Sequence, residues 1–251
     1  MDKNTVENKL SVLFENQNII AIDKRPGIIV IPDQHTELSR TLVGMAQTLI
    51  GGKLWVVHRI DKGTSGIVVF AKNAEAHADI SQQFEKGLVS KLYLALVNGS
   101  VLDDSGTIDA PISVDGREVG LDKDGKPSVT NYRVAERFRD FTLVEAMPGT
   151  GRRHQIRLHF MSLGHTLAVD PQYSGRDALF LSEFKKKYKA TGTEKPLLSR
   201  LSLHARNLTL TEPVMKTPVN IESPVPHDLE VTLKMLRKYN KPSMSKRRAI
   251  L

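Results

Sequence analysis

Six short apolar runs rich in β-branched residues recur along the 251-residue chain. Each is shorter than most helices, and this length and composition are typical of buried strands. The runs cover residues 19–22, 28–31, 67–70, 92–97, 141–146 and 201–210. A chain with this pattern places most of its apolar side chains in a sheet, so the sequence predicts a fold built around β-strands.

Other segments carry apolar residues at helical spacing and end at polar caps or glycines. We expect helices over residues 36–51, 73–87 and 152–163, and a further helix from Asp228 onward. The first would begin at a Thr36 cap and end at Gly51. In the third, Ile156, Phe160 and Leu163 would face inward.

Two turn signals, Asp115-Gly116 and Asp124-Gly125, predict antiparallel pairing around them. Strands and helices together predict an α+β fold with a mixed, largely antiparallel β-sheet and flanking helices. No repeat, low-complexity tract or linker divides the chain. We expect an N-terminal extension over residues 1–12, one catalytic domain over residues 13–240 and a basic tail over residues 241–251.

Lys and Arg together number 36 against 28 Asp and Glu, which gives a formal net charge of +8. Excess positive charge attracts phosphodiesters and speeds their encounter with the protein, so nucleic acid is the favoured partner. A solvated basic surface is the alternative, and charge alone does not separate the two.

The chain has no cysteine, which excludes disulfides, thiolate metal sites and a cysteine nucleophile. It shows neither a secretion signal nor the roughly 20 apolar residues that a membrane helix needs. It also lacks an HExxH pair, a nucleophile elbow and a complete phosphate loop. We therefore expect a cytoplasmic monomer without metal, cofactor or membrane contact, and hydrolase or phosphotransferase chemistry is disfavoured.

The densest polar cluster, His58–Gly66, comes directly before the apolar run at 67–70. A short loop that leads into a buried strand holds a carboxylate on a rigid scaffold, as catalytic groups commonly are. Asp61 is therefore a candidate catalytic residue. The alternative is a charged turn in which Asp61 accepts backbone N–H groups.

A second cluster, Gly149–Arg157, opens the predicted helix at 152–163. Arg153 and Arg157 are four residues apart, and His154 and Arg157 three, so we expect these side chains to share one helical face. Like charges on one face repel unless an anion lies opposite, such as RNA phosphate or Asp61. A solvated basic helix end is the alternative.

Five blocks, in this order, resemble the motifs of the RluA-type RNA pseudouridine synthases. They are His58–Gly66, Lys91–Gly99, Gly151–Arg157, Gly164-His165 with Asp170 and Tyr173, and Arg200–Ala205. The resemblance implies the pseudouridine synthase fold with a central active-site cleft. It also implies isomerisation of uridine in structured ribosomal or transfer RNA, in which the N1–C1′ bond breaks and the uracil rejoins through C5.

The resemblance implies that Asp61 is the essential carboxylate and that Arg157 grips it through a two-pronged contact that keeps it ionised. Tyr93 would stack on the uracil and could help to remove the last proton. Arg59 would fill the RNA helix when the uridine flips out. The other residues expected to bind RNA are His58, Thr64, Arg152, Arg153, His154 and Gln155. Whether Asp61 attacks C1′ or abstracts a sugar proton stays open.

Without the resemblance, Tyr93 could be a core residue and Arg59 a partner in a surface salt bridge. The chain departs from the family in Arg153, where Thr is usual, and in the shuffled segment Lys24–Gly27. We expect no S4-type RNA-binding domain and expect the catalytic domain itself to select the substrate. A catalytically silent RNA-binding protein is the rival interpretation, and the presence of the three implied catalytic residues argues against it.

Overall fold

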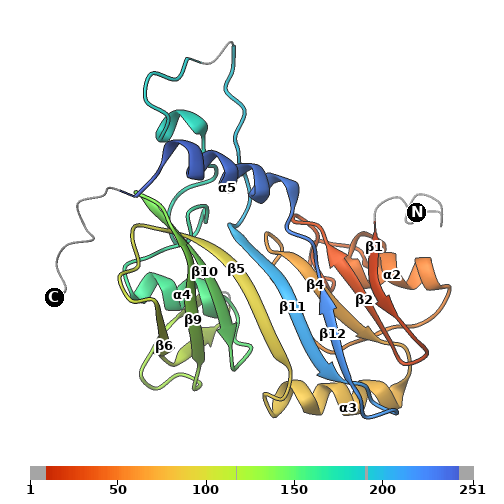
Figure 1. Ribbon diagram of the computed structural model, residues 1–251. Helices are drawn as coiled ribbons and strands as arrows, with labels where there is room; N and C mark the ends of the chain where they lie inside the picture. Colours follow the sequence, from red (N-terminus) through yellow and green to blue (C-terminus); the bar gives the residue numbers. More distant parts are fainter. Residues whose placement is uncertain (1–9, 117, 190–191, 243–251) are drawn as a thin grey trace.

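Ten strands form one twisted sheet at the centre of the molecule (Figure 1). The computed structural model describes residues 10–116, 118–189 and 192–242. Eight strands run in the order β1-β2-β4-β11-β5-β10-β9-β6, while β3 pairs with β4 and β12 with β11. Their bounds are β1 Ser11–Glu15, β2 Ile19–Lys24, β3 Trp55–Val56, β4 Ser65–Ala71, β5 Ser90–Asn98, β6 Ser105–Asp109, β9 Val129–Arg137, β10 Phe141–Pro148, β11 Leu203–Thr211 and β12 Pro218–Glu222.

Four α-helices and two 3-10 helices accompany the sheet in the described part of the chain. They are α2 Leu42–Ile50, α3 Ala74–Glu85, α4 Gln155–Ser162, α5 His227–Tyr239, η1 Leu38–Arg40 and η2 Leu181–Glu183. A separate hairpin joins β7 (Ile112–Asp115) to β8 (Glu118–Leu121), as the Asp115-Gly116 turn predicted. Among the strand pairs of the described residues only β4 and β11 run parallel, which confirms the α+β class and the largely antiparallel sheet.

Successive residues of β5 point to opposite faces of the sheet, because the side-chain period of a strand is two. Ala95 and Val97 pack in the cluster that holds Phe160 of α4. Leu96 packs in the cluster that holds Leu233 of α5. Helices α4 and α5 therefore cover opposite faces, and the odd-numbered residues of β5, including Tyr93, share the face of α4.

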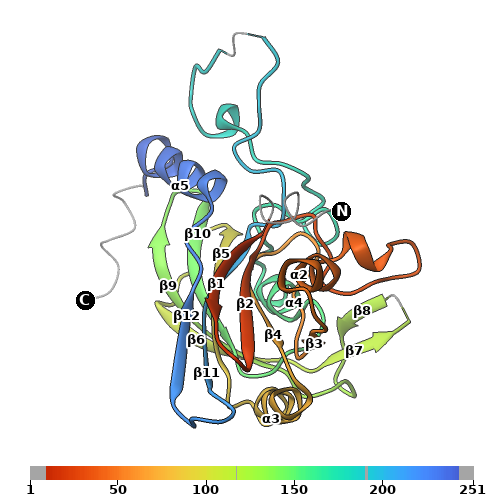
Figure 2. The same ribbon diagram turned by 90° about the vertical axis from the view of Figure 1, so that its right-hand side faces the viewer.

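The other half of the sheet repeats this arrangement. Ile20 and Ile22 of β2 pack in the cluster that includes α2, whereas Ile19 and Ala21 pack in the cluster that includes α3. Figure 2 shows α2 and α4 on the same side of the sheet and α5 on the other. The sheet is thus buried on both faces, which explains why its central strands read as continuous apolar runs.

The apolar run at 28–31 is not a strand, contrary to the prediction. The carbonyls of Ile29 and Val30 accept hydrogen bonds from the backbone N–H groups of Leu42 (2.8 Å) and Val43 (3.1 Å). These N–H groups open α2 and have no partner inside the helix. Helix α2 accordingly starts at Leu42 with Thr41 as its cap, and not at Thr36, although it ends at Gly51 as predicted.

Helix α4 also starts later than predicted, at Gln155, and Leu163 is 43% exposed and not inward-facing. Helix α3 confirms its prediction and its Asn73 cap, whose side chain accepts from Ala76 N at 2.8 Å. Helix α5 confirms the leucine spacing near the C-terminal end, because Leu229, Leu233 and Leu236 are all buried.

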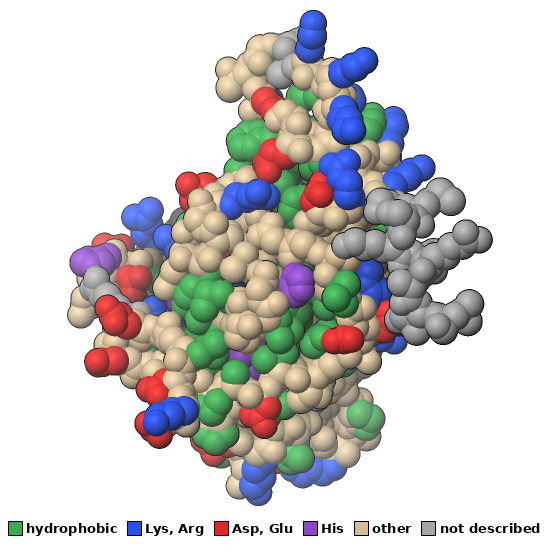
Figure 3. Space-filling view, turned by 90° about the vertical axis from the view of Figure 1, so that its left-hand side faces the viewer, with side chains coloured by type: hydrophobic (Ala, Val, Ile, Leu, Met, Phe, Trp, Pro, Cys, Tyr) green, Lys and Arg blue, Asp and Glu red, His purple; other side chains and the backbone are tan. Residues whose placement is uncertain are grey.

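The segment after η2 projects from the body of the molecule (Figures 1 and 2). It carries Lys185, Lys186, Lys187 and Lys189, and Figure 3 shows Lys and Arg side chains gathered on this projection. From residue 243 onward the predicted basic tail lies outside the described residues, as do residues 1–9 of the extension. No helix of the described segments has the length and apolar character that a membrane crossing requires.

Candidate active site

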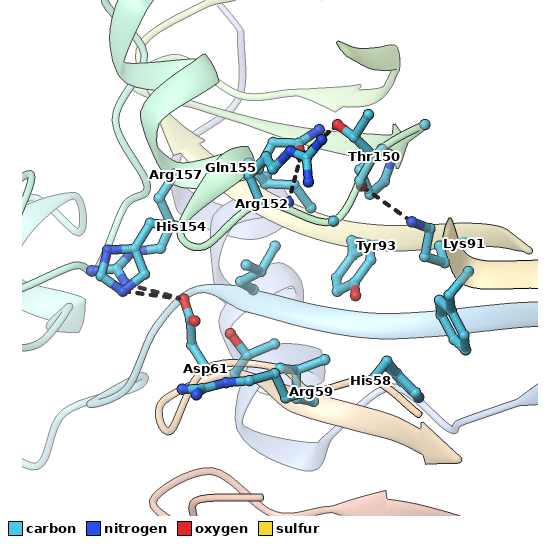
Figure 4. Close-up of a pocket in the computed structure, with 18 of the residues that line it drawn as sticks. His58, Arg59, Asp61, Lys91, Tyr93, Thr150, Arg152, His154, Gln155 and Arg157 are labelled. Atoms are coloured by element: carbon cyan, nitrogen blue, oxygen red, sulfur yellow. Dashed lines mark hydrogen bonds and ion pairs between the residues drawn. The ribbon is translucent and has the colours of Figure 1, made fainter. Parts of the chain in front are cut away.

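A pocket of about 380 Å³ lies beside α4 (Figure 4). Three segments supply most of its lining: the loop from His58 to Thr64 between β3 and β4, Lys91 and Tyr93 of β5, and the stretch from Gly149 into the start of α4. Phe84 and Glu85 of α3 and Leu203 of β11 also line it. The fold therefore brings together the first three of the motif blocks. Asp61, Tyr93 and Arg157, the three predicted catalytic residues, all line this one pocket.

The parallel pairing of β4 with β11 brings Asp61 close to Tyr93. Gly66 of β4 lies opposite Ala205 of β11, and Ala205 lies opposite Tyr93 of β5. Gly66 has φ +107, and a Cβ there would meet the carbonyl oxygen of Ala205 at 2.2 Å. Only glycine permits this conformation and this close approach, so the loop that holds Asp61 depends on Gly66 for its position.

Arg157 joins Asp61 to the interior of the protein. Its Nη1 donates to Oδ2 of Asp61 at 3.1 Å, which confirms the predicted pairing. Its Nε and Nη2 donate instead to the two oxygens of Asp170, at 2.7 and 2.9 Å. The two-pronged contact predicted for Asp61 is therefore wrong, because the guanidinium gives that contact to Asp170.

The buried carboxylate of Asp170 fixes the orientation of Arg157. Asp170 is fully buried and also accepts hydrogen bonds from the backbone N–H groups of Gln172 (3.0 Å) and Tyr173 (3.2 Å). Burial alone would lower the pKa of Arg157, but the hydrogen bonds and charges of Asp170 and Asp61 outweigh it and raise the pKa. The guanidinium thus stays charged in a site where a lone cation would be costly.

His154 is the second group beside Asp61. Its Nε2 lies 3.9 Å from Oδ2 of Asp61, and its Nδ1 lies 2.8 Å from the hydroxyl of Tyr173. Burial lowers the pKa of His154 to about 4, although the charge of Asp61 acts in the opposite direction. His154 and Arg157 therefore both face the carboxylate, as predicted, but with a neutral imidazole.

Arg153 does not share this face, contrary to the prediction. His154 has a left-handed backbone (φ 57) and precedes the first residue of α4, so the chain turns before the helix begins. Arg153 is exposed, whereas Arg157 is only 5% exposed. The two arginines therefore have different surroundings, one in solvent and one buried.

Tyr93 lies in the pocket and packs against the buried clusters of both α2 and α4. Burial and the negative charge of Asp61 raise the pKa of its phenol above the ordinary value. The phenol is thus neutral, and a neutral phenol is a weak base. Its ring is thus an uncharged, partly apolar surface of the pocket.

Three exposed arginines surround the pocket: Arg59, Arg152 and Arg153 lie at or next to its lining. None of their guanidinium groups pairs with an acidic side chain in the described part of the chain. The salt bridge considered for Arg59 is thus not formed there. Unpaired cations at a pocket mouth suit a polyanionic ligand.

The remaining predicted RNA-binding residues have different surroundings. Gln155 is buried and uses its amide to bond Val129 O (2.9 Å) and Thr130 Oγ1 (3.0 Å), so it holds the loop to β9. His58 accepts from Val69 N at 2.9 Å and stacks on Phe84. Both are engaged inside the protein. Thr64, by contrast, lines the pocket with a buried hydroxyl that has no hydrogen-bond partner among the described residues.

Sequence reasoning missed the part that Lys24 plays below the Asp61 loop. The side chain is fully buried, and its Nζ donates to the carbonyls of Arg25 (3.1 Å), Ile28 (2.8 Å) and Lys62 (3.1 Å). Burial lowers its pKa to about 7. Asp170 and Tyr173 were quoted in a motif block without a role, because no local spacing reveals that Asp170 meets Arg157.

The sequence pattern described as RNA pseudouridylate synthase matches residues 18–162. The chain belongs to this family. Its site contains no group of three or more His, Asp or Glu side chains within the described residues that could hold a metal ion.

Relatives of known name agree with this assignment. The ribosomal large subunit pseudouridine synthase D of Nitrosomonas europaea is 38% identical over 244 residues, which cover 94% of this chain and 68% of the relative. The dual-specificity RNA pseudouridine synthase RluA of Vibrio vulnificus is 35% identical over 211 residues, or 80% and 78% of the two chains.

A solved structure shares the fold. Human RNA pseudouridylate synthase domain containing 4 superposes with a TM-score of 0.70 at 23% identity, over 96% of this chain and 97% of that one. Family and relatives together identify the chain as an RNA pseudouridine synthase, an isomerase that converts uridine to pseudouridine in RNA.

Proposed function

We propose that the chain modifies uridine in the RNA of the large ribosomal subunit, with Asp61 as the reacting carboxylate. Relatives such as the one from Nitrosomonas europaea act, by name, on that subunit. The net charge of +8 and the unpaired arginines around the pocket suit a structured RNA. Transfer RNA is the second candidate; the RluA relative is named as having dual specificity.

The observation that carries the proposal is the orientation of Asp61. Arg157 holds one carboxylate oxygen at 3.1 Å, inside a pocket that also contains Tyr93 and is large enough for a base. An ionised carboxylate is needed both to attack C1′ and to take a sugar proton. Tyr93 then contacts the uracil ring while the N1–C1′ bond breaks and C5 rejoins the sugar, and Arg59 occupies the gap left in the RNA.

We also propose that the enzyme is a cytoplasmic monomer that needs no metal. Its catalytic domain would comprise residues 13–240. Activity should persist in the presence of a chelator, and size-exclusion chromatography with light scattering should give the mass of one chain, 28.0 kDa. Loss of activity on chelation would contradict the metal-free part alone.

Asp61→Asn tests the catalytic part. We expect the release of label from the uracil C5 position of transcribed ribosomal RNA to fall by about 10⁴-fold or more, while RNA binding remains, because an amide can neither attack nor accept the proton. Asp104→Asn is the matched control, since Asp104 also pairs with an arginine but is 90% exposed. Full activity of the Asp61→Asn enzyme would overturn the assignment.

The RNA target is tested separately by mapping pseudouridines in total RNA from cells with and without the gene. Carbodiimide-dependent primer-extension stops should disappear from the large ribosomal RNA. If they disappear from transfer RNA alone, the ribosomal assignment is wrong while the isomerase assignment stands.

A further inference from the structure

The two oxygens of Asp61 have different surroundings. Oδ2 accepts from Arg157 at 3.1 Å and lies 3.9 Å from Nε2 of His154. Oδ1 makes no hydrogen bond or ion pair with the residues drawn in Figure 4. The carboxylate is thus anchored through one oxygen, and the other is left for a ligand in the pocket.

Tyr173 contacts both groups that face Oδ2. Its hydroxyl lies 2.8 Å from Nδ1 of His154, and its ring lies 4.7 Å below the guanidinium carbon of Arg157. Its backbone N–H donates to Asp170, so the residue is tied to the same buried carboxylate that orients Arg157. A residue bonded in this way controls the positions of His154 and Arg157 together.

The neutral imidazole of His154 carries one N–H proton, either on Nδ1 or on Nε2. The position of this proton decides whether Asp61 faces an N–H donor or a lone pair. If Nδ1 carries the proton, Nε2 presents a lone pair to a carboxylate oxygen, which is repulsive. If Tyr173 donates its hydroxyl proton to Nδ1, Nε2 carries the N–H and presents it to Oδ2. The Tyr173 hydroxyl also lies 3.4 Å from the carbonyl oxygen of Val119, but Nδ1 of His154 is the nearer acceptor at 2.8 Å. Only the second arrangement gives both neighbours of the ring a favourable contact.

We propose that Tyr173 holds His154 as the tautomer protonated on Nε2, so that His154 is a second hydrogen-bond donor to Oδ2 of Asp61 and Oδ1 is the oxygen that meets the ribose. This inference rests on the proposed role of Asp61. Tyr173 is a positioning residue, since it acts on Asp61 only through His154 and Arg157. The gap of 3.9 Å exceeds hydrogen-bond length, so the proposal requires Nε2 and Oδ2 to approach each other when RNA binds.

The left-handed backbone of His154 supports a functional reason for this arrangement. A non-glycine residue with φ 57 is uncommon and persists where its surroundings hold it. His154 makes no side-chain cap bond to α4, so helix capping does not explain the conformation. The conformation instead places the ring between Tyr173 and Asp61.

The tautomer can be read directly on the free enzyme. In protein with ¹⁵N-labelled histidine, long-range ¹H–¹⁵N correlation spectra should show His154 protonated on Nε2, the signals being assigned by their loss in His154→Asn. Tyr173→Phe should shift the proton toward Nδ1, while Tyr132→Phe, a buried tyrosine outside the pocket, should not. Protonation on Nδ1 in the wild type, or an unchanged tautomer in Tyr173→Phe, would refute the proposal. This measurement needs no RNA, so it is independent of the outcome of Asp61→Asn.

Two substitutions of His154 test the donor in catalysis. The amide N–H of His154→Gln can take the place of Nε2–H, whereas His154→Asn suits the left-handed backbone better but donates only near Nδ1. We expect kcat of the Gln variant to exceed that of the Asn variant by about tenfold, with KM for RNA nearly equal. Equal kcat values, or a more active Asn variant, would show that backbone conformation and not the donor matters.

Discussion

Arginine has opposite environments in two regions of this pocket. Arg157, at the base, is 5% exposed and bonded to two carboxylates, whereas Arg59, Arg152 and Arg153, at the mouth, are exposed and unpaired with acids among the described residues. A buried guanidinium with both partners in place is rigid and barely screened by salt. Exposed ones are mobile and strongly screened.

Under the proposed function, the two environments predict two different roles. The buried arginine would orient Asp61, so its loss should change kcat. The exposed arginines would attract the RNA backbone, so their loss should change KM and the salt dependence.

Asp170→Asn should have the largest effect. The amide cannot complete the two-pronged bond, and a buried cation loses one of its two acidic partners. Breaking a buried ion pair from one side costs about 3–5 kcal/mol, so thermal unfolding should shift down strongly and kcat should fall about 10²-fold or more. Asp140→Asn, in an exposed pair with Arg139, is the control, and a mild effect of Asp170→Asn would mean that Asp61 alone orients Arg157.

Arg157→Lys should have a smaller effect on folding but still impair catalysis. Lysine keeps the charge and loses the fork that reaches Asp170 and Asp61 together. We expect kcat to fall about 10²-fold with KM little changed, measured by single-turnover kinetics at saturating enzyme. An increase in KM with normal kcat would place Arg157 among the RNA-attracting arginines.

Stability should fall as the pH drops from about 6.5 toward 4. His154 and His204 each have a pKa lowered to about 4, mainly by burial, while in the unfolded chain they titrate near 6.5. In this window the unfolded state binds more protons, so each histidine removes roughly 1 kcal/mol per pH unit. Calorimetry between pH 7 and 5 should show the decline, and a flat profile would mean that the two rings are charged in the folded protein.

Arg152→Ala and Arg153→Ala should have the smallest effects. Each should raise KM a few-fold, leave kcat unchanged and reduce the slope of log binding constant against log salt by about 0.7–0.9 per lost phosphate contact. Lys238→Ala on α5, which covers the opposite face of the sheet, is the control. A fall in kcat comparable to that of Arg157→Lys would break the distinction between base and mouth.

Local sequence patterns predicted helices and strands correctly where the packing buries the side that the apolar period defines. They failed near the N-terminal ends of two helices. Helices α3 and α5 and the central strands follow their apolar periods, because each buries the side that the period defines. The run at 28–31 has strand composition, but its carbonyls serve the first N–H groups of α2. The start of α4 was placed three residues early, because a left-handed His154 carries no strong signal in sequence.

In the candidate site, too, some features were predictable from the sequence and others depended on the tertiary structure. The resemblance of the motifs to the family implied that Asp61, Tyr93 and Arg157 belong to one site, and all three line the pocket. Tertiary structure alone decided that the fork of Arg157 grips Asp170, that Gln155 is a structural anchor and that Lys24 supports the Asp61 loop. The reason is physical: residue identity sets which bonds a side chain can make, but only the packing of distant segments sets which partner lies within reach of it.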